Sequence, residues 1–192
     1  SERDYQLASG LSQDVETDVN VLRQTTARLP WLLIGMIGGI GNSMILGNFD
    51  STFAAHPEMA LYIPLIGGTG GNVGTQSSAI IVQGLANSSL DAKNTFKQIT
   101  KESVVALINA TIISLLVYTY NFIRFGATAT VTYSVSISLF AVVMFASIFG
   151  TLVPMTLEKF KIDPAIATGP FIAITNDIIG MMLYMGITVL LS

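Results

Sequence analysis

The stretch at residues 162–191, IDPAIATGPFIAITNDIIGMMLYMGITVLL, decides the fold class of this chain. It is longer than the ~20 apolar residues that span the hydrocarbon core of a bilayer, so we predict a transmembrane helix. Asp177 is its only charged residue after Pro164, and this position falls near the middle of the membrane. An ionisable side chain at that depth is costly and usually serves a path for an ion or a substrate.

Small residues lead up to this carboxylate. Ala165, Gly169, Ala173 and Asp177 recur at every fourth position, so they share one helix face. One interpretation is a cation path along this face; the other is close helix packing, with Asp177 hydrogen-bonded to a neighbour. The carboxylate must be neutralised by a proton, a basic partner or a cation. No Lys, Arg or His lies deep in an apolar segment, which leaves a proton or a cation.

The composition agrees with a membrane protein. Charged residues make up 11% of the chain, against roughly a quarter in soluble domains, and the apolar residues fall in long runs. The absence of cysteine excludes disulfides and thiolate metal sites, and leaves oxygen ligands, which suit hard cations. No basic face for nucleic acid is visible, and the polar N-terminus does not resemble a cleavable signal peptide.

Four more apolar segments predict transmembrane helices, at about residues 30–46, 58–85, 103–123 and 131–157. The first begins at Pro30, which suits the first turn of a helix because its missing N–H would be unpaired there. Residues 1–28 are polar, and we expect a cytoplasmic or interfacial segment with a helix over about 14–28. The fold class predicted is an all-α integral membrane protein with five transmembrane helices per chain.

Two of these helices are predicted to be broken or kinked. In the second, Pro64 precedes the run GGTGGNVGTQSS at 67–78, and a polar, glycine-rich backbone at membrane depth favours a broken helix that lines an ion site. A tight crossing of helices is the alternative. A phosphate-cradling loop is rejected because the run lacks the Lys of such loops. In the fifth, Asp163-Pro164 reads as an N-cap and first turn, and Pro170 predicts a kink before Asp177.

The basic residues predict the orientation. Of the 9 Lys and Arg residues, all but Arg124 lie in residues 1–28, in the 86–102 loop or in the 158–163 turn. An excess of basic residues marks the cytoplasmic side of a membrane protein. We therefore expect a cytoplasmic N-terminus and an external C-terminus in the plasma (cell inner) membrane.

The chain resembles the transmembrane domain of the MgtE family of magnesium transporters and channels. The resemblance covers residues 29–192 and rests on RLPWL at 28–32, PLIGGTGGNVGTQS at 64–77, Lys101-Glu102, IDPA at 162–165, GPF at 169–171 and TNDIIG at 175–180. The glycine-rich run and the Asp of the last helix are specific as a pair. Residues 1–28 then include a remnant of the helix that connects this domain to soluble domains, which in the family sense Mg²⁺ and which the chain does not show.

The resemblance implies a homodimeric pore for Mg²⁺. It implies that Asp177 recognises the hydrated ion, together with the backbone carbonyls of Ala173 and Gly169 and with Asn72. Further pore-lining candidates are Gly71, Thr75 and Asn176. The residues alone do not separate Mg²⁺ from Mn²⁺, Ca²⁺ or Co²⁺, and the implied partners are a second copy of the chain, membrane lipids and divalent cations.

Three other readings remain at this point. A proton- or sodium-coupled cation carrier would use Asp177 as a relay and Gly67–Gly74 as its broken-helix site. A purely structural helix bundle would bind no cation. An intramembrane enzyme is the most distant, because His56 is the only His, lies in a predicted loop, and cannot serve a buried Ser.

Overall fold

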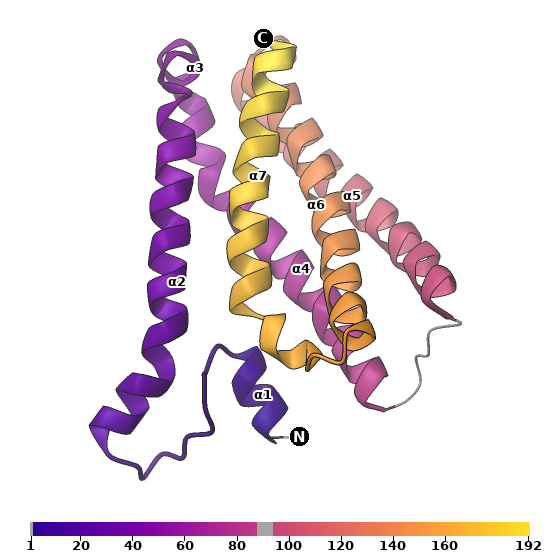
Figure 1. The fold of residues 1–192 in the computed structure, drawn as a ribbon. Coiled ribbons are helices and arrows are strands. Elements are labelled where there is room, and N and C mark those ends of the chain that lie inside the picture. Colours follow the sequence, from indigo (N-terminus) through magenta and orange to yellow (C-terminus); the bar gives the residue numbers. More distant parts are fainter. Residues whose placement is uncertain (1, 88–93) are drawn as a thin grey trace.

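The computed structural model describes residues 2–87 and 94–192, and the regular elements in these ranges are helices (Figure 1). In chain order the elements are α1 (Glu2–Ala8), α2 (Val21–Gly47), α3 (Asp50–Ala55), the 3₁₀ helix η1 (Pro57–Tyr62), α4 (Ile63–Ala86), α5 (Thr95–Phe125), α6 (Thr130–Lys159), the 3₁₀ helix η3 (Pro164–Ala167) and α7 (Pro170–Leu191).

Four of these helices, α2, α5, α6 and α7, are long and apolar enough to cross a membrane. This supports the predicted class of all-α membrane protein. The remaining predicted span, the second along the chain, corresponds to α4, which has 24 residues but is not among the four. At ~1.5 Å per residue, a helix of that length reaches about 36 Å, so length alone does not prevent α4 from crossing.

The two termini lie at opposite ends of the bundle (Figure 1). The N-terminus, α1 and η3 lie at one end, and α3 and the C-terminus lie at the other. This arrangement agrees with the predicted alternation of the spans. Lys93, which the orientation argument counted in the 86–102 loop, lies outside the described residues.

The first span starts earlier than predicted. The prediction of a helix over 14–28 and a separate start at Pro30 is wrong: α2 begins at Val21 and Pro30 lies inside it. Asn20 is the stronger start signal, because its side chain accepts a hydrogen bond from the Arg23 N–H at 2.9 Å. One turn before Pro30, the Ala27 carbonyl of α2 accepts hydrogen bonds from the Ser12 N–H and the Ser12 hydroxyl, each at 2.9 Å.

The glycine-rich run of α4 is helical. Pro64 lies in the first turn of α4, where its missing N–H costs no helix bond, and α4 continues unbroken through Gly67–Ser78. The predicted break in this helix is therefore not seen. The alternative holds: a Cβ on Gly150 of α6 would lie 2.5 Å from the Gly74 carbonyl oxygen. Glycines here allow α4 and α6 to cross in close contact.

The last span is interrupted earlier than predicted. Asp163 caps η3 by accepting the Ala165 N–H at 3.0 Å, and the chain then turns at Gly169, whose φ is +63°. Pro170 begins α7 and does not kink it, because a proline at the first position needs no helix partner. The break thus separates Ala165 from Ala173 and Asp177, which lie on one continuous helix.

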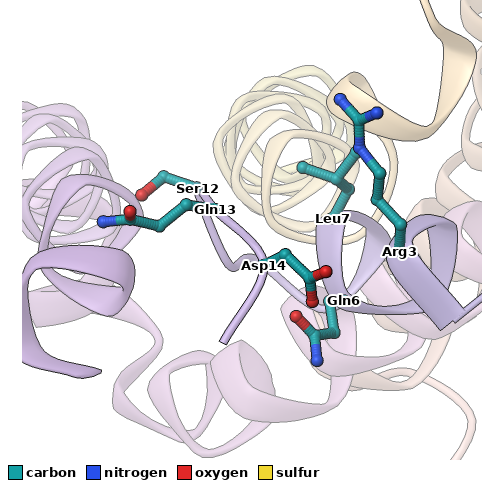
Figure 2. Close-up of a pocket in the computed structure, with 6 residues that line it drawn as sticks. All are labelled: Arg3, Gln6, Leu7, Ser12, Gln13 and Asp14. Carbon is teal, nitrogen blue, oxygen red and sulfur yellow. The ribbon is translucent and has the colours of Figure 1, made fainter. Parts of the chain in front are cut away.

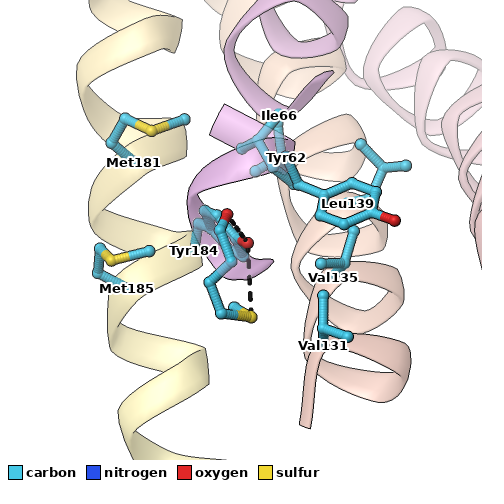
Figure 3. Packing of buried hydrophobic residues seen from close by; sticks show 10 residues of the cluster. Tyr62, Ile66, Val131, Val135, Leu139, Met181, Tyr184 and Met185 are labelled. Carbon is cyan, nitrogen blue, oxygen red and sulfur yellow. Dashed lines mark hydrogen bonds between the residues drawn. The ribbon is translucent and has the colours of Figure 1, made fainter. Parts of the chain in front are cut away.

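A hydrophobic cluster holds α7 against α4 and α6 near the end of the bundle that carries α3 and the C-terminus (Figure 3). It includes Met181, Tyr184 and Met185 of α7, Ile66 of α4 and Leu139 of α6. The Tyr184 hydroxyl donates to the Met59 carbonyl at 2.6 Å. Between membrane helices such side chains stabilise the contact through close van der Waals packing, since lipid tails are as apolar as they are.

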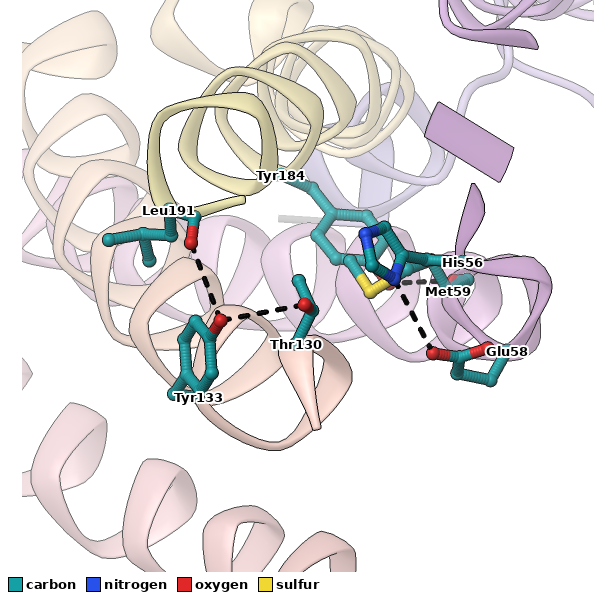
Figure 4. A network of polar contacts seen from close by, with 7 residues as sticks. All are labelled: His56, Glu58, Met59, Thr130, Tyr133, Tyr184 and Leu191. Atoms are coloured by element: carbon teal, nitrogen blue, oxygen red, sulfur yellow. Dashed lines mark hydrogen bonds and ion pairs between the residues drawn. The ribbon is translucent and has the colours of Figure 1, made fainter. Parts of the chain in front are cut away.

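Polar contacts fix the same end of the bundle (Figure 4). The Tyr133 hydroxyl of α6 lies 3.4 Å from the Leu191 carbonyl oxygen at the end of α7. His56 Nδ1 and Glu58 Oε1 lie 3.9 Å apart in the short segment before α4. The C-terminal half of α7 is therefore anchored, which gives Asp177 a defined position in the bundle.

Candidate cation site

Asp177 lies where three helices meet. It is half-buried on α7, and its Oδ2 accepts a hydrogen bond from Asn42 Nδ2 of α2 at 3.3 Å. A Cβ on Gly67 of α4 would overlap Asp177 Oδ1. The carboxylate therefore points into the interface of α2, α4 and α7, and the glycine leaves the room that it occupies.

Close approach of α2 to α7 brings Asn42 to the carboxylate. A Cβ on Gly38 would lie 2.6 Å from Ile174 Cγ2, and one on Gly35 would lie 3.8 Å from Ile174 Cδ1. Gly35, Gly38 and Asn42 are spaced by three and four residues, so they share one face of α2. The sequence analysis did not single out Asn42. The available signal was a polar residue on the same helix face as Gly35 and Gly38.

The two backbone candidates lie before Asp177, with Gly169 just before α7 and Ala173 in its first turn. The Gly169 carbonyl already accepts the Ala173 N–H at 2.9 Å, but a carbonyl oxygen has a second lone pair that a water can use. A Cβ on Gly169 would overlap the carbonyl oxygen of Ala8, and one on Gly10 would lie 2.6 Å from Pro170 Cγ. The N-terminal segment therefore packs directly on the start of α7.

The α4 candidates are placed differently from one another. A Cβ on Gly71 would lie 4.0 Å from the Ala173 Cα, so Gly71 faces α7. The Thr75 hydroxyl bonds to the carbonyls of Gly71 and Asn72, each at 3.0 Å, within its own helix. Asn72 itself is exposed on the chain. Its pore-lining role requires a surface shared with another copy and stays a prediction.

Asn176 occupies the inside of the bundle. It is 1% exposed, and a Cβ on Gly74 would overlap its Nδ2. Neither polar atom of its amide has a hydrogen-bond partner among the described residues. Asn176 and Asp177 thus face different neighbours, although they are adjacent in sequence.

A second buried carboxylate joins α5 to α4. Glu102 is 8% exposed and accepts a hydrogen bond from the Ser77 hydroxyl at 2.5 Å. The sequence analysis placed Glu102 just outside the third span, whereas α5 extends past it from Thr95 to Phe125. The sequence did not indicate that Ser77, the donor on α4, would meet this carboxylate.

The acidic groups do not gather into a cage for a bare metal ion. In residues 2–87 and 94–192 there is no group of three or more His, Cys, Asp and Glu side chains that could hold one. A single carboxylate with neutral neighbours suits an ion that keeps its water shell, which is how Mg²⁺ usually binds.

A pocket of about 390 Å³ lies on the N-terminal segment (Figure 2). Arg3, Gln6, Leu7, Ser12, Gln13 and Asp14 line it. Asp177 and the other candidate residues do not, so this pocket is separate from the candidate site.

The comparisons with known proteins identify the family. Residues 63–187 match the family model of MgtE, described as a divalent cation transporter. The chain is similar to the magnesium transporter MgtE of Bacillus subtilis, with 30% identity over 187 residues, which cover 97% of the chain and 41% of that protein. It is also similar to those of Thermus thermophilus, with 32% identity over 86% of the chain and 36% of the relative, and Enterococcus faecalis, with 29% over 96% and 40%.

The chain spans about two fifths of the length of these curated relatives. The match of the family model covers most of the helical bundle, including α4, α5, α6 and nearly all of α7. Both the glycine-rich helix and Asp177 fall inside it. The chain belongs to the MgtE family of divalent cation transporters, not to a family of enzymes.

Proposed function

We propose that this chain forms the membrane part of a magnesium transporter, with a channel-like pore in which Asp177 recognises hydrated Mg²⁺. The observation that carries the proposal is the lone carboxylate in the middle of α7. In the part of the chain that the structure describes, no Lys, Arg or His forms an ion pair with it. A buried charge without a basic partner needs a proton or a cation.

The site suits hydrated Mg²⁺ better than an ion that several protein ligands coordinate directly. Mg²⁺ gives up its waters reluctantly and is often held by one or two carboxylates. Asp177 can accept hydrogen bonds from those waters, and so can the carbonyls of Gly169 and Ala173. The choice of Mg²⁺ over Mn²⁺, Ca²⁺ or Co²⁺ rests on the names of the relatives, since one carboxylate does not discriminate strongly among them.

The pore is proposed to form between two copies of the chain. One carboxylate per chain is doubled by a two-fold axis, and Asn72 then has a surface to face. α2 packs chiefly against α7, and its apolar side chains Leu32, Ile37 and Met44 are exposed, so lipid or a second copy must cover them. Cross-linking in membranes is expected to trap a dimer; only monomer at native density would contradict this.

The topology completes the proposal. α4 also crosses the membrane and brings the number of spans to five. Residues 1–28 are cytoplasmic or interfacial, and residues 29–192 form the membrane domain in the plasma (cell inner) membrane. The end that carries the N-terminus and η3 faces the cytoplasm, because the described basic residues other than Arg124 lie there, in α1, in the first turns of α2 and α5, and at the end of α6.

Uptake by purified protein in liposomes tests the function. With a Mg²⁺-sensitive dye inside the vesicles, we expect uptake that depends on the Mg²⁺ gradient and persists without a proton or sodium gradient. Uptake that collapses when those gradients are removed would identify a coupled carrier. Vesicles without uptake of any divalent cation would contradict the proposal.

Gly67→Ala is expected to lower Mg²⁺ uptake at least tenfold while the protein still folds. The added Cβ overlaps Asp177 Oδ1, so the carboxylate must turn away; misplacement of a binding group by about 1 Å can cost on the order of a hundredfold in rate. Uptake is measured at matched amounts of protein in the vesicles. Gly68→Ala is the control on the same helix, since its Cβ would meet no atom within 4 Å. Equal uptake by the two variants would show that the Asp177 position does not matter.

A further inference from the structure

Asn42 is the polar residue of α2 that lies deepest against α7. It is 8% exposed, and the helix around it is apolar, with Ile40, Met44 and Ile45 as close neighbours in sequence. A polar side chain inside a membrane helix is costly unless it bonds to a partner. The partner of Asn42 is the candidate ion-binding group, because its Nδ2 donates to Asp177 Oδ2 at 3.3 Å.

Half of the Asn42 amide is unused. Its Oδ1 is buried and has no hydrogen-bond donor among the described residues. A buried acceptor without a donor usually marks a place for water, an ion or a ligand. Waters around a cation point their hydrogens outward, so a hydrated cation at Asp177 brings donors to the neighbourhood of this oxygen.

The carboxylate is held from two sides. Asn42 bonds to one oxygen, and the Gly67 backbone of α4 lies against the other, with no space for a Cβ between them. Gly38, four residues before Asn42, lets α2 come close enough to α7 for this bond. The three helices together therefore fix the direction of a side chain that would otherwise rotate.

We propose that Asn42 is a positioning residue of the cation site, which orients the Asp177 carboxylate through Nδ2 and offers Oδ1 to a water of the hydrated cation. This inference rests on the proposed function and adds α2 to the site. The alternative is that Asn42 only joins two helices, as polar residues do in membrane proteins. The two roles differ in their effect on ion affinity.

The test is the apparent KM for Mg²⁺ uptake in liposomes. Asn42→Leu removes the donor and the acceptor while it keeps the branched shape, and Asn42→Gln keeps the amide on a longer side chain. We expect Asn42→Leu to raise the KM about threefold to tenfold, the range that the loss of one long hydrogen bond of ordinary net strength allows. Asn42→Gln should lie between it and the unchanged protein. A role in packing alone predicts that Leu is tolerated at least as well as Gln.

The matched control is Asn109→Leu, the same substitution at an exposed position of α5, which should leave the KM unchanged. A second readout is the rise in melting temperature on addition of Mg²⁺, since an ion that binds the folded state stabilises it. Asn42→Leu should reduce this rise in the unchanged background and have no further effect in Asp177→Asn, because both act through one group.

An unchanged KM in Asn42→Leu, with Asp177→Asn inactive, would overturn this inference and leave the proposed function intact. Absence of Mg²⁺ uptake by the unchanged protein would instead overturn the proposed function. If Asn42→Leu fails to reach the membrane, Asn42→Ser replaces it in the test. Serine keeps a small polar group, but its side chain is too short to remake the 3.3 Å bond to Asp177 Oδ2. A raised KM in this variant supports the inference, and an unchanged KM contradicts it.

Discussion

Asp177→Asn is expected to abolish Mg²⁺ uptake while the protein still folds and inserts. The substitution keeps the shape of the side chain and removes its charge. At an effective dielectric constant of about 20, a carboxylate and a divalent ion about 5 Å apart attract by on the order of 6 kcal/mol before desolvation and screening. Even a tenth of this attraction changes the occupancy of the site by Mg²⁺ about threefold. Loss of a larger fraction leaves the site nearly empty at millimolar Mg²⁺, and transport stops. Uptake is measured in liposomes at matched amounts of protein.

Two companion variants make this result specific. Asp177→Glu keeps the charge, but its extra methylene enters the space beside Gly67 that the carboxylate already fills, so we expect reduced but measurable uptake. Asn72→Ala removes a neutral, exposed amide and should do less harm than Asp177→Asn. Near-normal uptake by Asp177→Asn would show that the carboxylate is structural, and the assignment of the site would have to be withdrawn.

Gly150→Ala is expected to destabilise the bundle by about 1–3 kcal/mol, the usual cost of overpacking a tight interior. The new Cβ would lie 2.5 Å from the Gly74 carbonyl oxygen and 3.2 Å from two more backbone atoms of Gly74. A backbone cannot move aside as a side chain can, so α4 and α6 must separate. The measurement is thermal unfolding in detergent, followed by circular dichroism.

Gly186→Ala is the control for this prediction, because a Cβ at Gly186 of α7 would meet no atom within 4 Å. Both substitutions replace a helical glycine by alanine, so they share the gain of about 1 kcal/mol in helix propensity. The difference between them isolates the contact of α4 with α6. Equal melting temperatures would mean that the crossing at Gly74 and Gly150 is looser than the structure shows.

Much of the helical architecture could be predicted from the sequence because apolar length is a direct signal of a membrane helix. The third and fourth predicted spans fall within α5 and α6. The errors concern prolines and glycines, whose effect depends on where in a helix they lie. Pro64 and Pro170 are harmless in first turns, while Pro30, expected at a start, lies inside α2 because Asn20 caps the helix earlier.

The candidate site was only partly predictable. Asp177 stood out because a charge in an apolar run has few explanations. Asn42 did not: its place in line with Gly35 and Gly38 marks only a packed face of α2, and the approach of α2 to α7 is what brings it to Asp177. Glycines pose the same difficulty: the run in α4 reads equally well as a broken helix or as a crossing surface, and only the position of Gly150 opposite Gly74 decides between them.

The central claim is that a hydrated divalent cation binds at Asp177. The most direct measurement is a structure of the protein in a membrane mimic with Mn²⁺ in place of Mg²⁺, in which anomalous scattering locates the ion. We expect a peak about 4–5 Å from the Asp177 carboxylate oxygens, the distance at which a water lies between a carboxylate and the ion, and its loss in Asp177→Asn. A well-ordered protein at saturating Mn²⁺ with no peak near Asp177, or a peak unchanged in Asp177→Asn, would contradict the account.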